Sequence, residues 1–308
     1  MKNLKKILIA LAVVALLVSS FALIVGAEGE YSGDLKKLYN NYAAVDSTAS
    51  ATAQAAALST AYNYLLGNTF DPEATYEVTV GEGDDAEKIT YTYADIVALT
   101  DAASVSVGEL LYANAEAATT ADDRMSATSA LLTHIAACPA TEGTAGYAEL
   151  VAKASAKNSA VVAEQYELAA AAETSADAQK ILVALSEHTA KYPLDATADA
   201  ALIASIQTLA CEIAAELHTA WTEIPTEHVD AGAEPDGKCD VCAGAMDSST
   251  SAHYFKRYND IYSAKYFIAK VGLLVNGSAV AGLTGENKTA VDNVIISLRQ
   301  KGPQRRKG

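Results

Sequence analysis

The sequence predicts a mainly α-helical protein: a helical-hairpin repeat array with one small β-hairpin insertion and a second small helical body. Alanine makes up about a fifth of the 308 residues, and only six residues are proline. This composition favours helix, because alanine loses no side-chain entropy when it joins one. An internal repeat and one local alternation of apolar and polar residues support the rest of the prediction.

The N-terminus has the features of an export signal. Lys2, Lys5 and Lys6 precede an uncharged, mostly apolar run over residues 7–25, and small residues follow it. We predict a signal peptide over residues 1–27 and an extracellular or cell-surface location. The run is also long enough for an uncleaved membrane anchor, and we expect no later segment to cross a bilayer.

The charge of the chain argues against nucleic-acid binding. Loss of the three signal lysines lowers the formal charge from −16 to −19. An acidic surface of this kind repels phosphate backbones, and the basic tail over residues 301–308 is short. We predict that this tail is disordered, and that any membrane contact comes only from an uncleaved anchor.

Two short segments alternate apolar or aromatic residues with polar ones, on either side of a Gly/Asp-rich loop. This pattern is typical of a β-hairpin. We predict one over about 75–93, packed against helices, because an isolated hairpin is barely stable. The alternating positions are Tyr76, Val78, Val80, Ile89, Tyr91 and Tyr93.

An internal repeat relates residues 104–139 to residues 158–193 at an offset of 54. Each copy is interpreted as a helical hairpin. The second helix begins at a capping-box spacing, and a proline ends it. The matches other than alanine are Val107/Val161, Tyr112/Tyr166, Thr120/Thr174, Asp123/Asp177, Leu131/Leu185, His134/His188 and Pro139/Pro193.

Further helices and two helical domains complete the predicted organisation. The domains cover residues 28–225 and 246–300, and a His/Cys/Asp-rich linker module over residues 226–245 separates them. Additional helices are expected over residues 34–45, 48–66, 94–116, 145–156, 197–222, 252–275 and 285–299.

The repeat resembles tetratricopeptide-type helix–turn–helix repeats. Both have an aromatic residue in the first helix, small residues at the crossing and a proline after the second helix. The period is 54 rather than about 34, and the usual tryptophan and glycine are absent. The resemblance therefore implies an architecture of stacked hairpins, which form extended grooves suited to peptides or partner proteins.

The stretch HVDAGAEPDGKCDVC, from His228 to Cys242, carries the chemistry of the linker module. A Cys239–Cys242 disulfide suits an exported chain. A zinc site would use both thiolates, His228 and a further group such as Asp236. A calcium loop built on the carboxylates and a plain solvated linker are the other two interpretations.

This stretch also resembles short modules of the form H-x-D-x(n)-D-G-x-C-D-x-C-G, which recur, often between domains, in large secreted proteins of Gram-positive anaerobes. Ala243 stands where those modules have a closing glycine. The resemblance implies a surface-protein spacer that a metal could stabilise, and it implies no enzyme. The matching residues are His228, Asp230, Asp236, Gly237, Cys239, Asp240 and Cys242.

Several other residues invite a functional interpretation. Four tyrosines at a spacing of four residues would stack along one helical side, either for packing or as an aromatic platform for a sugar or peptide. These are Tyr254, Tyr258, Tyr262 and Tyr266. His134 and His188 are expected to be satisfied at helix–helix contacts, and Cys138 and Cys211 to be free buried thiols.

No common catalytic or nucleotide-binding motif is found, so we predict no enzyme. We expect an exported, non-enzymatic binding or scaffold protein at the cell surface, with a protein or glycan partner. One alternative is an extracellular metal- or ligand-binding module centred on the His228–Cys242 loop, with zinc as its cofactor. The other is a non-catalytic part of a larger carbohydrate-active surface protein.

Overall fold

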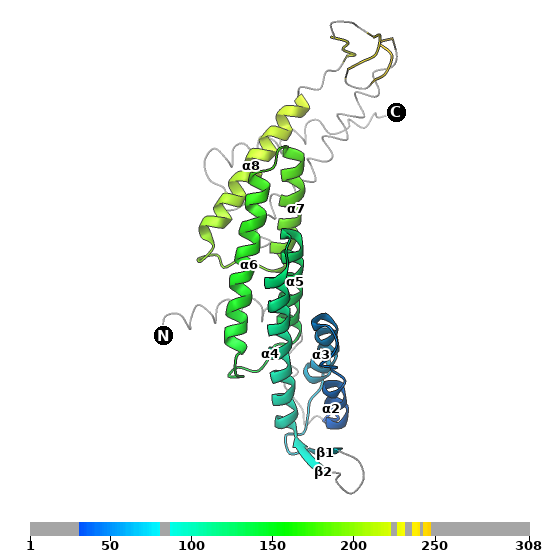
Figure 1. The fold of residues 1–308 in the computed structure, drawn as a ribbon, viewed down its shortest axis with the longest axis vertical. Coiled ribbons are helices and arrows are strands. Elements are labelled where there is room, and N and C mark those ends of the chain that lie inside the picture. Colours follow the sequence, from blue (N-terminus) through cyan, green and yellow to red (C-terminus); the bar gives the residue numbers. More distant parts are fainter. Residues whose placement is uncertain (1–30, 81–86, 223–226, 232–235, 241–242, 248–308) are drawn as a thin grey trace, which may run out of the picture. The chain divides into compact units, whose positions relative to one another are not determined.

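The computed structural model describes residues 31–80, 87–222, 227–231, 236–240 and 243–247. These residues form a mainly helical structure with one small antiparallel sheet (Figure 1), which confirms the predicted fold class. The chain divides into two compact units, unit 1 (Met1–Val161) and unit 2 (Val162–Gly308). The elements are α2 (Leu35–Ala43), α3 (Ala51–Leu66), β1 (Thr75–Val80), β2 (Glu87–Thr92), α4 (Tyr93–Ala117), α5 (Ala121–Ala137), α6 (Tyr147–Ala170), α7 (Ser175–Lys191) and α8 (Ala200–Thr222).

Several predictions fall outside the described residues. These are the signal peptide over residues 1–27, the helices over 252–275 and 285–299, and the tail over 301–308. They remain predictions, as do the boundaries of the C-terminal helical domain.

The predicted β-hairpin is present, and it packs on α2 and α4 at one end of unit 1 (Figure 1). Tyr76 of β1 pairs with Tyr91 of β2 in the antiparallel register. The ring of Tyr39, on α2, lies against both, with centroid distances of 5.5 Å to Tyr76 and 5.2 Å to Tyr91. The helix therefore supplies the apolar contact that two strands alone lack.

The main core of unit 1 lies where α3, α4, α5 and the first half of α6 meet. Leu58, Leu131 and Leu150 are fully buried there. Gly108 allows α6 to approach α4 closely, because a Cβ atom at this position would lie 2.3 Å from Leu150 Cδ2. A glycine at this contact thus brings two long helices together.

Helix α4 is long and apolar enough to cross a bilayer, the one such helix in the part of the chain that the structure covers. This corrects the expectation that no segment after the signal has that character. One face of α4 is nevertheless buried in the unit 1 core and carries the polar residues Asp101 and Ser104. We therefore interpret α4 as a core helix.

Both predicted N-caps are present, one in each unit. Thr120 Oγ1 accepts a hydrogen bond from the Asp123 N–H at 3.1 Å, and Thr174 Oγ1 accepts one from the Asp177 N–H at 3.2 Å. The first helix of the second repeat differs from the prediction, because α6 continues through the expected break near residue 157. No glycine or proline stands there to end it.

The core of unit 2 is built from the second half of α6 together with α7 and α8. Its fully buried large side chains are Leu182, Leu185 and Ile206, and the small residue Ala210 is also buried. Leu131 in unit 1 and Leu185 in unit 2 are equivalent by the repeat offset, and both are fully buried. The repeat thus predicts core positions correctly.

Candidate functional site

The linker module brings the histidine segment against the first cysteine. The N–H of Asp240 donates to the carbonyl of Val229 at 2.8 Å, and the N–H of Val229 lies 3.5 Å from Cys239 Sγ. Cys239 is buried, and His228 is half-buried. His228 and Cys239, two of the predicted metal ligands, therefore lie on neighbouring backbone segments that are joined by a hydrogen bond.

The aspartates of the module hold the loop together. Asp230 Oδ2 accepts from the Gly237 N–H, and Asp240 Oδ2 accepts from the Ala231 N–H, both at 2.9 Å. Asp236 Oδ1 accepts from the N–H two residues further on, also at 2.9 Å. These bonds give each carboxyl group a structural role in the loop.

Ala243 adopts a backbone conformation that favours glycine. Its φ is +55°, in the left-handed region that glycine adopts without steric cost. Its N–H donates to the carbonyl of Cys239 at 2.7 Å.

Within the described segments, no three His, Cys, Asp or Glu side chains gather closely enough to hold a metal ion. Cys242, the second predicted thiolate, lies outside those segments. The disulfide, zinc, calcium and linker interpretations therefore all remain predictions. The four tyrosines from Tyr254 to Tyr266 also lie outside the described residues.

The two repeat histidines are buried between helices. His134 is 3% exposed, and its Nε2 lies 2.9 Å from the carbonyl of Ser104 on α4. A carbonyl only accepts, so Nε2 carries the proton. The other ring nitrogen, Nδ1, is buried without a hydrogen-bond partner among the described residues, so the expected satisfaction at a helix contact holds for Nε2 alone. Burial lowers the pKa of His134, and burial with the charge of Lys191 lowers the pKa of His188 to about 4.

The isolated cysteines are free and buried, as predicted. Burial raises the pKa of Cys138 to about 12. Burial, and to a lesser extent the charge of Glu212, raises the pKa of Cys211 to about 11. Both thiols are therefore neutral and unreactive at physiological pH.

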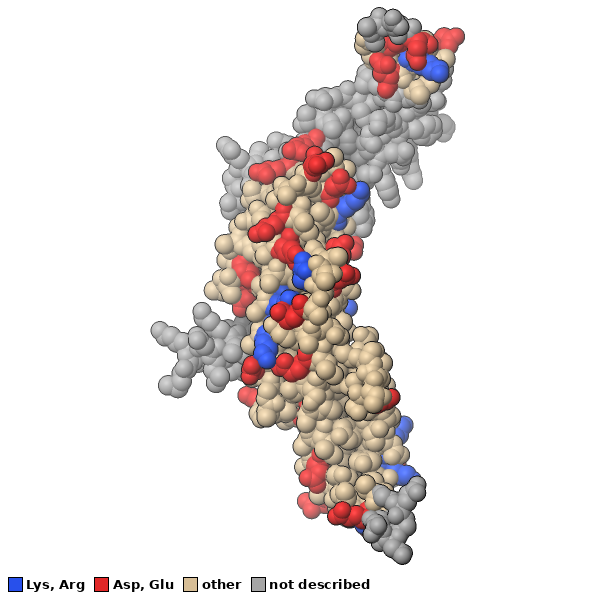
Figure 2. All heavy atoms as spheres, in the orientation of Figure 1, with Lys and Arg blue, Asp and Glu red and all other residues tan. Residues whose placement is uncertain are grey.

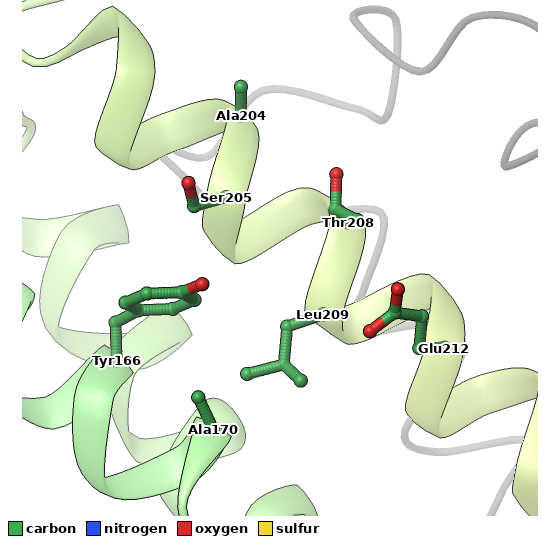
Figure 3. Close-up of a pocket in the computed structure, with 7 residues that line it drawn as sticks. All are labelled: Tyr166, Ala170, Ala204, Ser205, Thr208, Leu209 and Glu212. Carbon is green, nitrogen blue, oxygen red and sulfur yellow. The ribbon is translucent and has the colours of Figure 1, made fainter.

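A groove lies between α6 and α8 in unit 2 (Figure 3). Its volume is about 430 Å³. The hydroxyl of Tyr166 points toward α8, where Ser205 and Leu209 lie beside the ring (Figure 3). The remaining lining residues are Ala170 from α6 and Ala204, Thr208 and Glu212 from α8. The groove therefore combines an aromatic ring, two aliphatic hydroxyl groups and one carboxyl group.

In unit 1 charged side chains lie near the equivalent tyrosine. Tyr112 on α4 is the repeat equivalent of Tyr166, and the Nζ of Lys153 lies 5.9 Å from the centre of its ring. Lys153 pairs with Glu109 and Glu149, both at 3.1 Å. Lys157, also on α6, pairs with Glu116 on α4 at 2.6 Å.

The buried faces of α6 and α8 show which residues replace these groups in unit 2. The buried positions of α6 and α8 match at two offsets. Leu150 and Ala154 match Ile206 and Ala210 at an offset of 56, and Ala154, Asn158 and Val161 match Ile206, Ala210 and Ile213 at an offset of 52. Lys153 therefore corresponds to Leu209 or to Ser205, and neither residue carries a charge. The tyrosines themselves lie on α4 and α6, which are related by the offset of 54. Under that offset Ala170 is the equivalent of Glu116. Shorter or uncharged side chains thus leave the groove open.

The sequence by itself does not reveal this groove, although Tyr166 stands out as a repeated position. The repeat ends at residue 193, before α8 begins. The departure of α8 from the offset of 54 becomes visible only from the buried faces of the helices. Comparison of the chain with protein-family models, with curated proteins and with solved structures finds no match.

Proposed function

We propose that this chain is an exported, non-enzymatic scaffold protein that binds a macromolecular partner at the cell surface through the groove between α6 and α8. The observation that carries the proposal is the contrast between the repeats. In unit 1 the ion-paired Lys153 lies over the ring of Tyr112, whereas in unit 2 a groove borders the ring of Tyr166.

The buried polar groups of the helical core support a structural rather than a catalytic interpretation. The Tyr62 hydroxyl donates to Asp101, and the Ser104 hydroxyl donates to the carbonyl of Cys138 at 2.6 Å. His134 bonds the backbone of α4. These groups connect neighbouring helices, so their hydrogen-bonding capacity contributes to the fold.

A site-specific photo-cross-linker tests this proposal. It is placed at Thr208, which lines the groove, or at Glu187, an exposed position on α7, and the full-length protein is irradiated on intact producing cells. We expect a discrete cross-linked product from position 208 and none from position 187. Equal products from both positions, or none from position 208, would contradict the proposal.

A second function is favoured by the contact between Val229 and Cys239. An N–H directed at a cysteine sulfur stabilises the thiolate form that binds metals, and the same backbone pairing brings His228 alongside. We propose that the module binds zinc through His228 and the two cysteines of the sequence pattern.

Metal analysis of reduced protein purified without chelator tests this second function. Wild-type protein is expected to hold about one zinc ion, which Cys239→Ser or His228→Gln removes and Asp247→Asn retains. Zinc content that is the same in all four proteins would exclude the site. Intact mass before and after alkylation then shows whether the cysteines are oxidised instead.

A further inference from the structure

We infer that the groove beside Tyr166 takes a basic side chain, lysine or arginine, from the partner. This inference rests on the proposed function, and it names the chemical class of the partner segment. The contrast between Tyr112 and Tyr166 carries it.

Unit 1 shows what the tyrosine ring accepts. A lysine ammonium over the face of a tyrosine, within about 6 Å of the centroid, is held by the negative charge of the ring face. Lys153 occupies this position over Tyr112. In unit 2 the uncharged Leu209 packs beside Tyr166 (Figure 3).

The chain does not supply a replacement cation from the same helix. Helix α8 contains no lysine or arginine over Ala200–Thr222. The groove instead contains the exposed acid Glu212. Within the described residues no lysine or arginine lies over the Tyr166 ring as Lys153 lies over Tyr112. A ring of this kind next to a carboxyl group is complementary to a positive side chain from a partner.

The surrounding charge favours the same occupant. Residues 162–222 contain nine acidic residues and two lysines, and Figure 2 shows acidic side chains on the visible face of α6, α7 and α8. Such a field attracts a basic segment over roughly 8–10 Å at physiological salt. The hydroxyl groups of Ser205 and Thr208 can accept hydrogen bonds from an ammonium or guanidinium group.

The test is binding of a fluorescent decapeptide of alternating lysine and glycine to the full chain, measured by anisotropy at low salt. Three variants raise the net charge equally by one. Glu212→Gln removes the groove acid, Leu209→Lys places a lysine beside Tyr166, and Glu187→Gln is the matched control on α7. Tyr166→Leu removes the ring without a change in charge.

We expect Glu212→Gln and Tyr166→Leu each to raise the Kd by about two- to fivefold. Leu209→Lys should abolish saturable binding, because its own ammonium covers Tyr166. Glu187→Gln should change the Kd by less than about 1.5-fold. Circular dichroism checks that each variant is folded, and Glu212→Gln, at an exposed position, keeps the test valid if Leu209→Lys is unfolded.

Equal Kd values for Glu212→Gln and Glu187→Gln would overturn the inference, since binding would then reflect net charge alone. Stronger binding of the matching glutamate–glycine peptide would also overturn it. A cross-link from position 208 without lysine-peptide binding would leave the proposed function standing and refute the basic partner. Absence of that cross-link would refute the function itself.

Discussion

The hydroxyl of Tyr62 on α3 donates a hydrogen bond of 2.6 Å to Asp101 Oδ1 on α4, in the interior of unit 1. The other carboxyl oxygen, Asp101 Oδ2, accepts from the Thr141 N–H at 3.0 Å. One buried acid thus connects two helices and the loop that follows α5. Burial and this bond raise the pKa of Tyr62 above its usual range, so the phenol remains protonated.

The first prediction concerns this bond. Tyr62→Phe keeps the ring but leaves Asp101 Oδ1 without its phenol donor, and an unsatisfied buried acceptor costs about 1–3 kcal/mol. We expect the free energy of unfolding in urea to fall by that amount. Tyr42→Phe, at a half-buried position on α2, is the control and should cost less than about 0.5 kcal/mol. Equal losses of unfolding free energy in the two variants would show that the Tyr62–Asp101 hydrogen bond does not stabilise the fold.

The second prediction concerns acid sensitivity. His134 and His188 have a lower pKa in the folded protein than in the unfolded chain, so the unfolded chain binds protons more readily. Their stabilising contribution is complete above about pH 6.5. It is lost as the pH falls through each folded-state pKa, which for His188 is about 4. For His188 the full loss is about 3 kcal/mol, from a shift between 6.5 and about 4.

Thermal unfolding at pH 7 and pH 4.5 measures this effect. The fall in Tm between the two values should be smaller in His188→Gln than in the wild type, whatever the stability of the variant at pH 7. His188 gives the clearer test, because its pKa is lowered by a large amount, to about 4. The same fall in Tm in both proteins would count against a role for this histidine.

The third prediction concerns the turn of the linker module. Ala243→Gly relieves the left-handed backbone strain at φ +55°, a gain of about 1–2 kcal/mol per residue, reduced by the greater unfolded-state entropy of glycine. We expect slower hydrogen exchange at the amide of residue 243, which bonds the Cys239 carbonyl. Ala245→Gly is the control, and faster or unchanged exchange in Ala243→Gly would refute the strain.

The fourth prediction concerns the two repeated N-caps. Thr120→Ala and Thr174→Ala each remove a hydroxyl that accepts the N–H of the third helical residue, and each should cost about 1 kcal/mol. Thr119→Ala, one residue before the first cap, should be near neutral. Urea unfolding followed by circular dichroism measures all three. A cost for Thr119→Ala equal to that of Thr120→Ala would contradict capping.

Much of the fold follows from local sequence rules. Alanine content predicted helices, the alternation around Tyr76 and Tyr91 predicted the hairpin, and threonine–aspartate spacing predicted the starts of α5 and α7. These signals act within a few residues, so the sequence carries them directly. The prediction of a helix end near residue 157 is wrong, because α6 continues to Ala170. A repeat boundary need not end a helix, and no glycine or proline stands there to stop it.

The candidate site depended on contacts between distant residues. Composition and spacing could identify Tyr166 as a repeated position, but not that the uncharged Leu209 packs beside its ring. That contact depends on which face of α8 is buried, and packing sets this face independently of any offset in the sequence. Local propensity therefore determined the elements, whereas tertiary packing decided which tyrosine lies beneath a lysine and which borders a groove.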